Sequence, residues 1–504
     1  MTLAASHDLS IRQFLPPRAS TKLPTSARQF SRARVERARE IHPQPSVTAF
    51  CRAFSRMRHL FLFATLFLLW LSPLRAFAQS QAPLCGTNCQ PADSAPPNLT
   101  TENPRIVNSR KISIHISDSE NLLGNISGGL KQGFTTQGVL TISLDIEQRK
   151  TTRKRSGTFH ASLLQLHGKP LSSTYLDALQ AANGNEGENG TRLWELWYAQ
   201  SFDRNIYNIK IGQQSIDNEF ITSDYSGFFI NTMAGWPLLP SYDMYGGGPA
   251  YPLSSLGARL RFNATHQLTL LIGAFDDNPG GGRFQQDTQK LDNHGVKFNT
   301  NTGALIIGEA QFATAFSALP GVVKVGAWYD TGAFPDQYWA TDGLSQVNPS
   351  NNHRPLMHRG NYSAYITADQ NIWQSPRNTN ESVNLFARFM VAPSDRNFIN
   401  WSFNGGATKT SPLPNRPNDQ CGVDVGIGHV GHQAAALDAE SGLLAQGTET
   451  LIEFTYQAQI TQHFIIQPVF QYIIHPGGTE SNPSSPLQSI GNEIVLGARA
   501  SVMF

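Results

Sequence analysis

Charged residues separated by a single apolar residue recur along this chain, and they are the residues with which it could do chemistry. Arg259 and Arg261 flank Leu260, and Asp145 and Glu147 flank Ile146. In a β-strand, residues two apart project to the same side, so each pair puts two charges on one face and an apolar side chain on the other. Guanidinium and carboxylate groups that oppose each other across a narrow space would order water and hydrogen-bond the hydroxyl groups of a polar solute.

Placing such charges is costly unless water reaches them. A charge that faces lipid costs about 2–4 kcal/mol near the bilayer midplane. Burying the same charge in a dry core without a partner costs more. A water-filled interior avoids both costs and makes the chain a conduit, so we take the following polar residues as candidates for a substrate pathway. Those on expected strands are Glu195, Lys210, Arg259, Arg261, Arg388, Glu453, Gln467 and Gln471, and those on a long intervening segment are Asp217, Glu219, Asp224 and Trp236.

The C-terminal segment shows which elements would position these residues. From Glu493 to Phe504, apolar side chains alternate with a more mixed set that includes Glu493 and Arg499. This period-2 pattern is typical of a strand whose two faces meet different solvents. The strand runs to a terminal aromatic residue, which a soluble domain seldom exposes at a fraying end. The pattern therefore favours an outer-membrane barrel, with an apolar outside and a polar inside.

The rest of the chain repeats eight to twelve alternating residues followed by a Gly, Asn, Asp or Pro cluster. Fifteen segments fit: 138–147, 157–167, 192–202, 205–212, 256–264, 267–275, 303–316, 321–330, 361–373, 382–391, 396–404, 422–430, 449–460, 463–474 and 492–504. A single-chain bacterial barrel needs an even number of strands, so one more is expected at 111–117 or 123–131. The predicted fold is all-β, a transmembrane antiparallel barrel of sixteen strands closed by the strand that ends at Phe504. Trp328, Tyr329, Trp373 and Trp401 would suit its interfacial aromatic girdles.

The N-terminal region indicates export. Met57 and Arg58 precede an uncharged run at 60–71, and Ala76-Phe77-Ala78 follows as a cleavage site before Gln79. These parts make residues 57–78 a secretory signal peptide. Residues 79–114 read as a flexible periplasmic tail and 115–504 as the barrel.

The basic excess of the full chain lies ahead of the predicted barrel. Residues 1–56 carry ten Lys or Arg against three acids, and they are either an artefact of the gene model or a basic leader. Without residues 1–78, 27 basic residues face 34 acidic ones, so charge does not point to a nucleic-acid partner. Cys85 and Cys89 could form a disulfide after export.

The segment 213–255 is the longest break between strong strands in the N-terminal half. It carries acids and aromatic residues, among them Asp243 and Tyr245. Carboxylates hydrogen-bond the hydroxyl groups of a solute, and aromatic faces pack against its apolar surfaces. Two positions are open: folded inward, where it would constrict the lumen, or exposed outside the cell.

One motif points elsewhere. Gly426-Ile427-Gly428-His429-Val430-Gly431 matches the glycine pattern of dinucleotide sites, which require a βαβ unit; the alternation around it instead favours another barrel strand. Patterns for nucleotide hydrolysis, calcium loops or Ser and metal hydrolases are missing, and the His residues lack metal spacing. We expect no cofactor and no metal. A barrel enzyme resembling an outer-membrane esterase or phospholipase, and a secreted glycan-binding β protein, are the alternatives.

Several motifs resemble the carbohydrate-selective porins of the OprB type from Gram-negative outer membranes. They are Phe229–Thr232, Phe275–Gly281, Tyr251–Arg261, Gln467–Gly478 and Ile494–Arg499. The resemblance covers roughly 115–504 and implies a sixteen-stranded barrel that passes monosaccharides such as glucose by facilitated diffusion. The apolar outer face and the terminal Phe504 point to outer-membrane lipid and the barrel assembly machinery as partners. Monomer and homotrimer both remain open.

Overall fold

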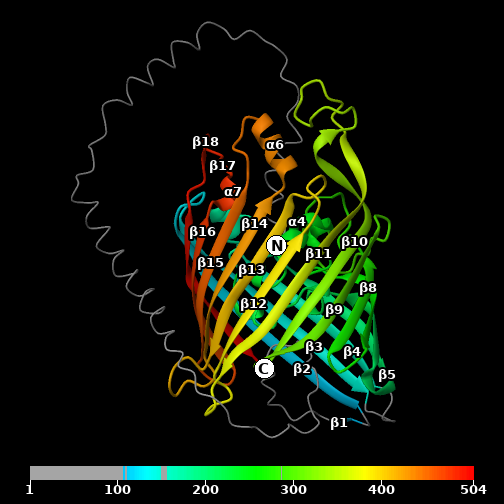
Figure 1. Ribbon diagram of the computed structural model, residues 1–504, viewed down its shortest axis with the longest axis vertical. Helices are drawn as coiled ribbons and strands as arrows, with labels where there is room; N and C mark the ends of the chain where they lie inside the picture. Colours follow the sequence, from blue (N-terminus) through cyan, green and yellow to red (C-terminus); the bar gives the residue numbers. More distant parts are fainter. Residues whose placement is uncertain (1–105, 108–109, 149–155, 285) are drawn as a thin grey trace, which may run out of the picture. The chain divides into compact units, whose positions relative to one another are not determined.

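The computed structural model describes residues 106–107, 110–148, 156–284 and 286–504, and most of them form one closed antiparallel barrel (Figure 1). Each long strand pairs with its neighbours in the sequence, and the last strand pairs with the first long one. The predicted all-β barrel of sixteen strands is confirmed. The strands are β2 (Arg110–Ser127), β3 (Gly133–Gln148), β4 (Ser156–Gly168), β5 (Gly190–Phe202), β6 (Tyr207–Gln214), β7 (Ser255–Asn263), β8 (Leu268–Asp276), β9 (Ala304–Phe316), β10 (Leu319–Ala340), β11 (Pro355–Gln374), β12 (Ser382–Val391), β13 (Ile399–Thr410), β14 (Gln420–Val430), β15 (Thr448–Gln459), β16 (Phe464–Ile474) and β19 (Glu493–Met503).

The strand missing from the periodicity count is β2, which covers 111–117 and the first five residues of 123–131. It begins at Arg110, and the two-residue strand β1 (Ile106–Val107) pairs with its start. The first long strand thus begins five residues before the predicted barrel start at 115. The basic leader, the signal peptide, Cys85 and Cys89 lie outside the described residues.

The alternation assigns the two faces of the barrel correctly in the strands that show it best. In β7, Leu256 and Leu260 are exposed on the outside, and Arg259 between them is buried inside. Barrel closure follows from the last strand: β19 runs antiparallel to β2, and the Phe504 backbone N–H donates to the Ile116 carbonyl at 2.8 Å. The Phe504 ring stacks on His463 with 5.4 Å between centroids.

The two ends of the barrel differ in the length of their connections. At the end that carries β1 and the C-terminus, turns such as 203–206 and 317–318 are short (Figure 1). At the other end lie long loops with α6 (His432–Glu440), α7 (Pro476–Thr479) and the hairpin of β17 (Ser481–Asn482) and β18 (Ser485–Ser489). Outer-membrane barrels have short periplasmic turns and long extracellular loops, which orients this one.

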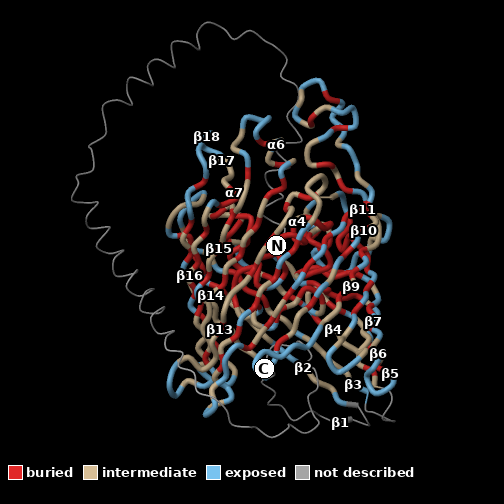
Figure 2. The backbone as a smooth tube through the Cα atoms, viewed as in Figure 1, coloured by how far each residue is buried: buried red, intermediate tan, exposed pale blue. Residues whose placement is uncertain are grey.

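The barrel interior is filled over part of its height. Figure 2 shows the buried residues gathered there. They include Trp328, which was expected in an interfacial girdle but faces inward and is buried in an apolar cluster. The expectation for Trp328 failed because this position of β10 faces the barrel interior, where apolar residues of the connection between β6 and β7 pack against it. Among the described residues, no helix is long and apolar enough to cross a membrane.

Candidate pore constriction

The long connection between β6 and β7, residues 215–254, folds into the barrel, and we call it the inner loop. It consists of short turns of helix: η3 (Ile216–Asn218), η4 (Ser226–Phe228), η5 (Thr232–Ala234), α4 (Leu238–Asp243) and η6 (Tyr245–Gly247). Such short helices leave many backbone N–H and C=O groups without partners inside the loop. Of the two positions predicted for this segment, the inward one is observed, and the barrel wall supplies the missing hydrogen bonds.

Carboxylates on the wall accept the backbone N–H groups of the inner loop. Glu195 on β5 accepts from Ser215 at 3.0 Å, and Glu309 on β9 accepts from Ile221 at 2.9 Å. On β11, Asp369 accepts from the Asp224 backbone N–H at 3.0 Å. Because each carboxylate comes from a different strand, the loop is fixed at successive points around the inner wall.

Cationic and amide side chains hold the carbonyl groups of the same loop. Arg388 on β12 donates to the carbonyls of Ile221 at 3.1 Å and Gly235 at 2.8 Å, and also to those of Met233 and Ala234. Lys324 on β10 donates to Thr222 O at 2.9 Å, and Gln467 on β16 donates to Phe228 O at 2.8 Å. Arg388 thus binds the loop at two places that are fourteen residues apart in the sequence.

The densest contact lies at Ile230 and Asn231 of the inner loop. Glu453 on β15 is fully buried and accepts from both backbone N–H groups, at 2.8 and 2.9 Å. It also accepts from the Asn231 side chain at 2.8 Å and from Gln471 at 3.0 Å. The Asn231 amide further donates to Asp424 on β14 at 2.9 Å. A buried carboxylate with four donors has its charge compensated, so Glu453 anchors the loop and does not face open water.

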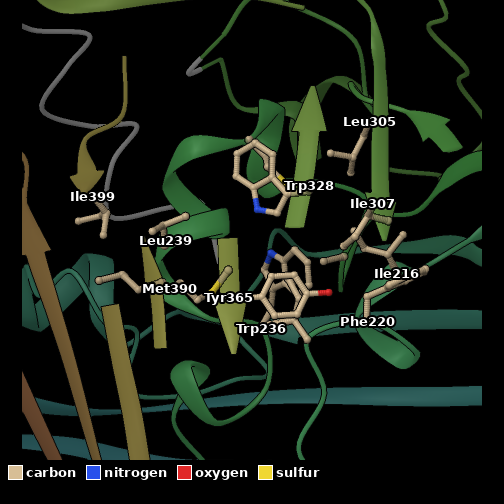
Figure 3. Packing of buried hydrophobic residues seen from close by; sticks show 14 of the residues in the cluster. Ile216, Phe220, Trp236, Leu239, Leu305, Ile307, Trp328, Tyr365, Met390 and Ile399 are labelled. Atoms are coloured by element: carbon tan, nitrogen blue, oxygen red, sulfur yellow. The ribbon is translucent and has the colours of Figure 1, made fainter. Parts of the chain in front are cut away.

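An apolar contact completes the attachment. Trp236 and Leu239 of the inner loop pack against inner-face residues of several strands, including Trp328, Tyr365 and Met390 (Figure 3). The Trp236 side chain is 2% exposed, and its indole N–H donates to Gly247 O at 2.8 Å. Its predicted place on the substrate pathway is therefore wrong. An aromatic residue in a loop gave no sign of whether its ring would face the passage or the wall.

A second loop, residues 169–189, also turns inward and lies beside the first. Gly184 N–H donates to Ile230 O at 2.7 Å, and Gln471 donates to Ala182 O at 2.7 Å. Glu449 on β15 accepts from the backbone of Leu179 at 2.7 Å. Gln471 thus faces inward, as the alternation predicts, but it contacts loop backbone and is fully buried.

The turn after β16 has a structural role in this arrangement. Gly477 N–H donates to Glu449 at 2.7 Å, and Gly478 O accepts from Gly447 N–H at 2.6 Å. Gly478 has a φ of 71°, and a Cβ there would lie 2.8 Å from Gly447 O. A side chain is excluded at this position by both backbone conformation and space, which explains the Gly-Gly pair of the motif.

The glycine pattern at 426–431 has a packing role as well. Gly426 and Gly428 lie in β14, between β13 and β15, so the βαβ unit of a dinucleotide site is not formed there. A Cβ on Gly426 would lie 2.2 Å from Gln180, and one on Gly428 would lie 2.1 Å from Leu238. The missing side chains let both inward-folded loops approach the wall. Within the described part of the chain, no group of three or more His, Cys, Asp and Glu residues could hold a metal ion.

A charged cluster occupies the side of the barrel formed by β6 and β7. Glu219 of the inner loop is ion-paired with Lys210, with Arg259 at 2.5 Å and with Arg261 at 3.3 Å. Burial acts to raise the pKa of Glu219, but the positive charges of Lys210, Arg259 and Arg261 lower it by more. The pKa therefore lies below its ordinary value, at about 2. The cluster carries three cations and one anion, so it presents an excess of positive charge to whatever lies next to it.

The cationic side chains of this cluster differ in how far solvent can reach them. The Arg259 side chain is 4% exposed and also donates to Asn208, whereas the Arg261 side chain is 26% exposed. Lys210 is buried and lies 4.7 Å from the centre of the Trp197 ring. The sequence brought Arg259 and Arg261 to one face correctly, but only the structure separates the covered arginine from the accessible one.

The remaining two predicted acids of the loop have different surroundings. Asp217 accepts from Ser215 Oγ at 2.5 Å and from Tyr251 N–H at 3.0 Å, so it fixes the start of the loop to its end. Burial raises its pKa to about 6, although these hydrogen bonds act in the opposite direction. Asp224 is exposed, together with Asn218, Gly227 and Gly235. These four residues mark the accessible face of the inner loop.

Comparison with known proteins agrees with this architecture. The profile of the carbohydrate-selective porins, OprB family, matches residues 131–504. The chain belongs to that family. It is 24% identical to Porin B of Pseudomonas aeruginosa over 75% of this chain and 85% of the relative. A structure of Pseudomonas putida OprB at high pH superimposes with a TM-score of 0.69 at 20% identity, covering 78% of this chain and 94% of that one.

Family membership identifies the chain as an outer-membrane porin for carbohydrates. It does not reveal which inner residues hold the loop. Sequence reasoning left Glu309, Asp369 and Asp424 out of the candidate site, although each has the acidic character and strand position of the residues that were chosen. The motif at Phe229–Thr232 was a further signal, because its Asn231 is the residue that Glu453 and Asp424 bind.

Proposed function

We propose that small carbohydrates, monosaccharides such as glucose, diffuse through this barrel past the accessible face of the inner loop and the cluster around Glu219. The observation that carries the proposal is the Glu219 cluster, where an accessible arginine lies beside a carboxylate at the edge of the constricting loop. Guanidinium groups donate to hydroxyl oxygens, and carboxylates accept from hydroxyl hydrogens. Asp224 and Asn218 on the same loop add further polar contacts.

Transport is tested by swelling of liposomes that contain the purified protein. Glucose should enter quickly, a trisaccharide slowly, and small anions faster than cations of equal size, because the cluster is net positive. Arg261→Ala should change the rates of glucose and of anions, whereas Leu260→Ala on the adjacent outward position serves as the matched control. Equal rates for glucose and the trisaccharide would contradict a constriction formed by the inner loop.

The protein is proposed to act without catalysis. The matching relatives are porins, and an enzyme of the outer-membrane esterase type would need a Ser and His pair on its outer wall. Two outward-facing His residues in the described strands have other partners: His167 contacts Glu120 and Gln165, and His429 contacts Thr448. Release of fatty acid from phospholipid micelles by the pure protein, above the rate of a heat-denatured sample, would contradict this reading.

Export is proposed to remove residues 1–78. Mass spectrometry of the protein purified from outer membranes should give a chain that starts at Gln79, and a start before Met57 would contradict the assignment of the signal peptide. Recognition by the barrel assembly machinery is proposed to use Phe504, so its deletion should lower the amount in the outer membrane. Monomer and homotrimer are both compatible with transport, because one barrel contains the whole proposed passage.

A further inference from the structure

The extracellular edge of the barrel carries two lysines at the ends of β2, β3 and β4. Lys131 lies in the turn between β2 and β3, and Lys169 is the first residue after β4. Both residues are exposed. Their ammonium groups lie 5.0 and 5.7 Å from the centre of the same aromatic ring, that of Tyr175 in η1 (Ser172–Leu176). Two cations are therefore held beside each other at the membrane surface.

Backbone hydrogen bonds fix this arrangement. The Tyr175 carbonyl accepts from the backbone N–H groups of Leu130 at 3.0 Å and Lys131 at 3.2 Å, and the Lys169 N–H donates to Thr136 O at 2.9 Å. Within the part of the chain that the structure describes, neither ammonium group forms an ion pair with a carboxylate. Because like charges repel each other, the two lysines favour an anion next to them.

A polar group adjoins the lysines on the outward face of β2 and β4. Glu120 Oε1 lies 2.6 Å from His167 Nε2, and His167 Nδ1 lies 3.1 Å from Gln165 Oε1. His167 is the second-last residue of β4, two residues before Lys169. The side chains of His167 and Glu120 are 44% and 43% exposed. Lipid tails offer no hydrogen bonds, so these accessible groups require a polar partner.

We propose that Lys131, Lys169, Glu120, Gln165 and His167 bind the headgroup of lipopolysaccharide, and we call these five residues the outer rim site. The phosphates of this glycolipid match the two ammonium groups. Its sugar hydroxyl and amide groups can exchange hydrogen bonds with the carboxylate, the imidazole and the side-chain amide. The site lies at the end of the barrel that carries the long extracellular loops, and lipopolysaccharide occupies the leaflet on that side.

Apolar side chains beside the outer rim site suit the acyl chains of the same lipid. On β2, β3 and β4, the outward residues Leu122, Phe134 and Leu163 are 53%, 58% and 44% exposed. Leu122 is two residues from Glu120, and Leu163 is two residues from Gln165, so each shares its face of the strand with a polar member of the site. One lipid molecule can therefore place its headgroup on the polar residues and its tails on the apolar ones.

Binding is tested on the full protein, purified in mild detergent and freed of lipid. Added lipopolysaccharide should raise the midpoint of heat unfolding, and lipopolysaccharide without its lipid A phosphates should raise it much less. Lys131→Gln with Lys169→Gln should weaken binding by about thirtyfold, since each basic residue at an anionic lipid surface is worth roughly a fivefold change in affinity. Lys297→Gln, at an exposed lysine of another extracellular loop, is the matched control. Equal affinity of the double variant and the parent, or equal affinity for the two forms of the lipid, would overturn the proposal.

A second measurement identifies what occupies the site in the cell. Native mass spectrometry of protein extracted from outer membranes should show bound lipopolysaccharide in the parent and in Lys297→Gln, and its loss in the double lysine variant. Glu120→Leu with His167→Leu should weaken binding but keep the preference for the phosphorylated lipid, because both lysines remain. Phospholipid or a second polypeptide retained in place of lipopolysaccharide would overturn the proposal. Glucose swelling rates of the same variants report separately on transport.

Discussion

Two sides of the same inner wall hold the inner loop in different ways. From β9 to β16, side chains of the wall hydrogen-bond the backbone of the loop, as Glu453 and Arg388 do. On β6 and β7, the side chains of Lys210 and Arg259 instead form ion pairs with one loop side chain, Glu219. A backbone contact fixes where the chain runs, whatever the loop residue is, whereas a contact between side chains can be changed by a single substitution. The first side therefore sets the path of the loop, and the second sets the charge that a solute meets.

Removing a wall side chain that hydrogen-bonds the backbone of the inner loop should have the largest effect on conductance. In Glu453→Leu, the backbone N–H groups of Ile230 and Asn231 lose their acceptor while buried, at a cost of about 1–3 kcal/mol each, and the Asn231 amide keeps only Asp424 as acceptor. We expect the inner loop to leave the wall, so that single-channel conductance rises and sugar block is lost. Phe454→Leu, the next residue on the outward face, is the matched control. Unchanged conductance in a folded Glu453→Leu protein would show that the remaining hydrogen bonds from the wall hold the inner loop in place without Glu453.

The difference between the two sides also explains what the sequence could predict. Alternation identified the strands, their faces and the inner positions of Glu453, Arg388 and Gln471, because each depends on residues two apart. It did not show that these side chains are covered, since that depends on contacts such as Glu453 to Asn231, which are 222 residues apart. The same limit applies to Trp328, whose burial depends on where the inner loop packs.

Substituting Glu219 should change selectivity more than stability. Glu219→Gln removes the only carboxylate that contacts Lys210, Arg259 and Arg261 in the described ion pairs, and the three cations then repel one another. One unit charge at roughly 7 Å is worth about 0.6 kcal/mol in water, or about threefold in local ion concentration. Reversal potentials in a salt gradient should shift toward anions by about this ratio. A shift toward cations would contradict the assignment of the cluster to the passage.

The two arginines should then separate in their effects. Arg261→Ala should shift selectivity toward cations by about threefold or less, on the same Coulomb estimate, and leave stability nearly unchanged, because Arg261 is partly accessible. Arg259→Ala should lower the midpoint of heat unfolding on gels more than Arg261→Ala does, because it leaves Glu219 with fewer buried partners. The control is Leu260→Ala, which should change neither selectivity nor sugar block. Equal behaviour of the two arginine variants would mean that their difference in exposure has no consequence.

The smallest expected effect is that of pH between 8 and 4. The pKa of Glu219 is lowered to about 2 in the folded protein, so its carboxylate stays charged over this range. Its contribution to stability is present above its ordinary pKa of about 4.3 and is lost only as pH falls toward 2. Asp217 has a pKa raised to about 6 and titrates within the range, so Asp217→Asn removes its contribution. Other inner acids such as Asp276 and Asp424 also have raised pKa values, of about 6 and about 7, so the Asp217→Asn protein is compared with the same protein that also carries Glu219→Gln. The difference in anion selectivity between these two proteins should be constant from pH 8 to 4 and should vanish below about 3, as Glu219 becomes protonated. A difference that vanishes near pH 5 would show that Glu219 is not held by its three cations.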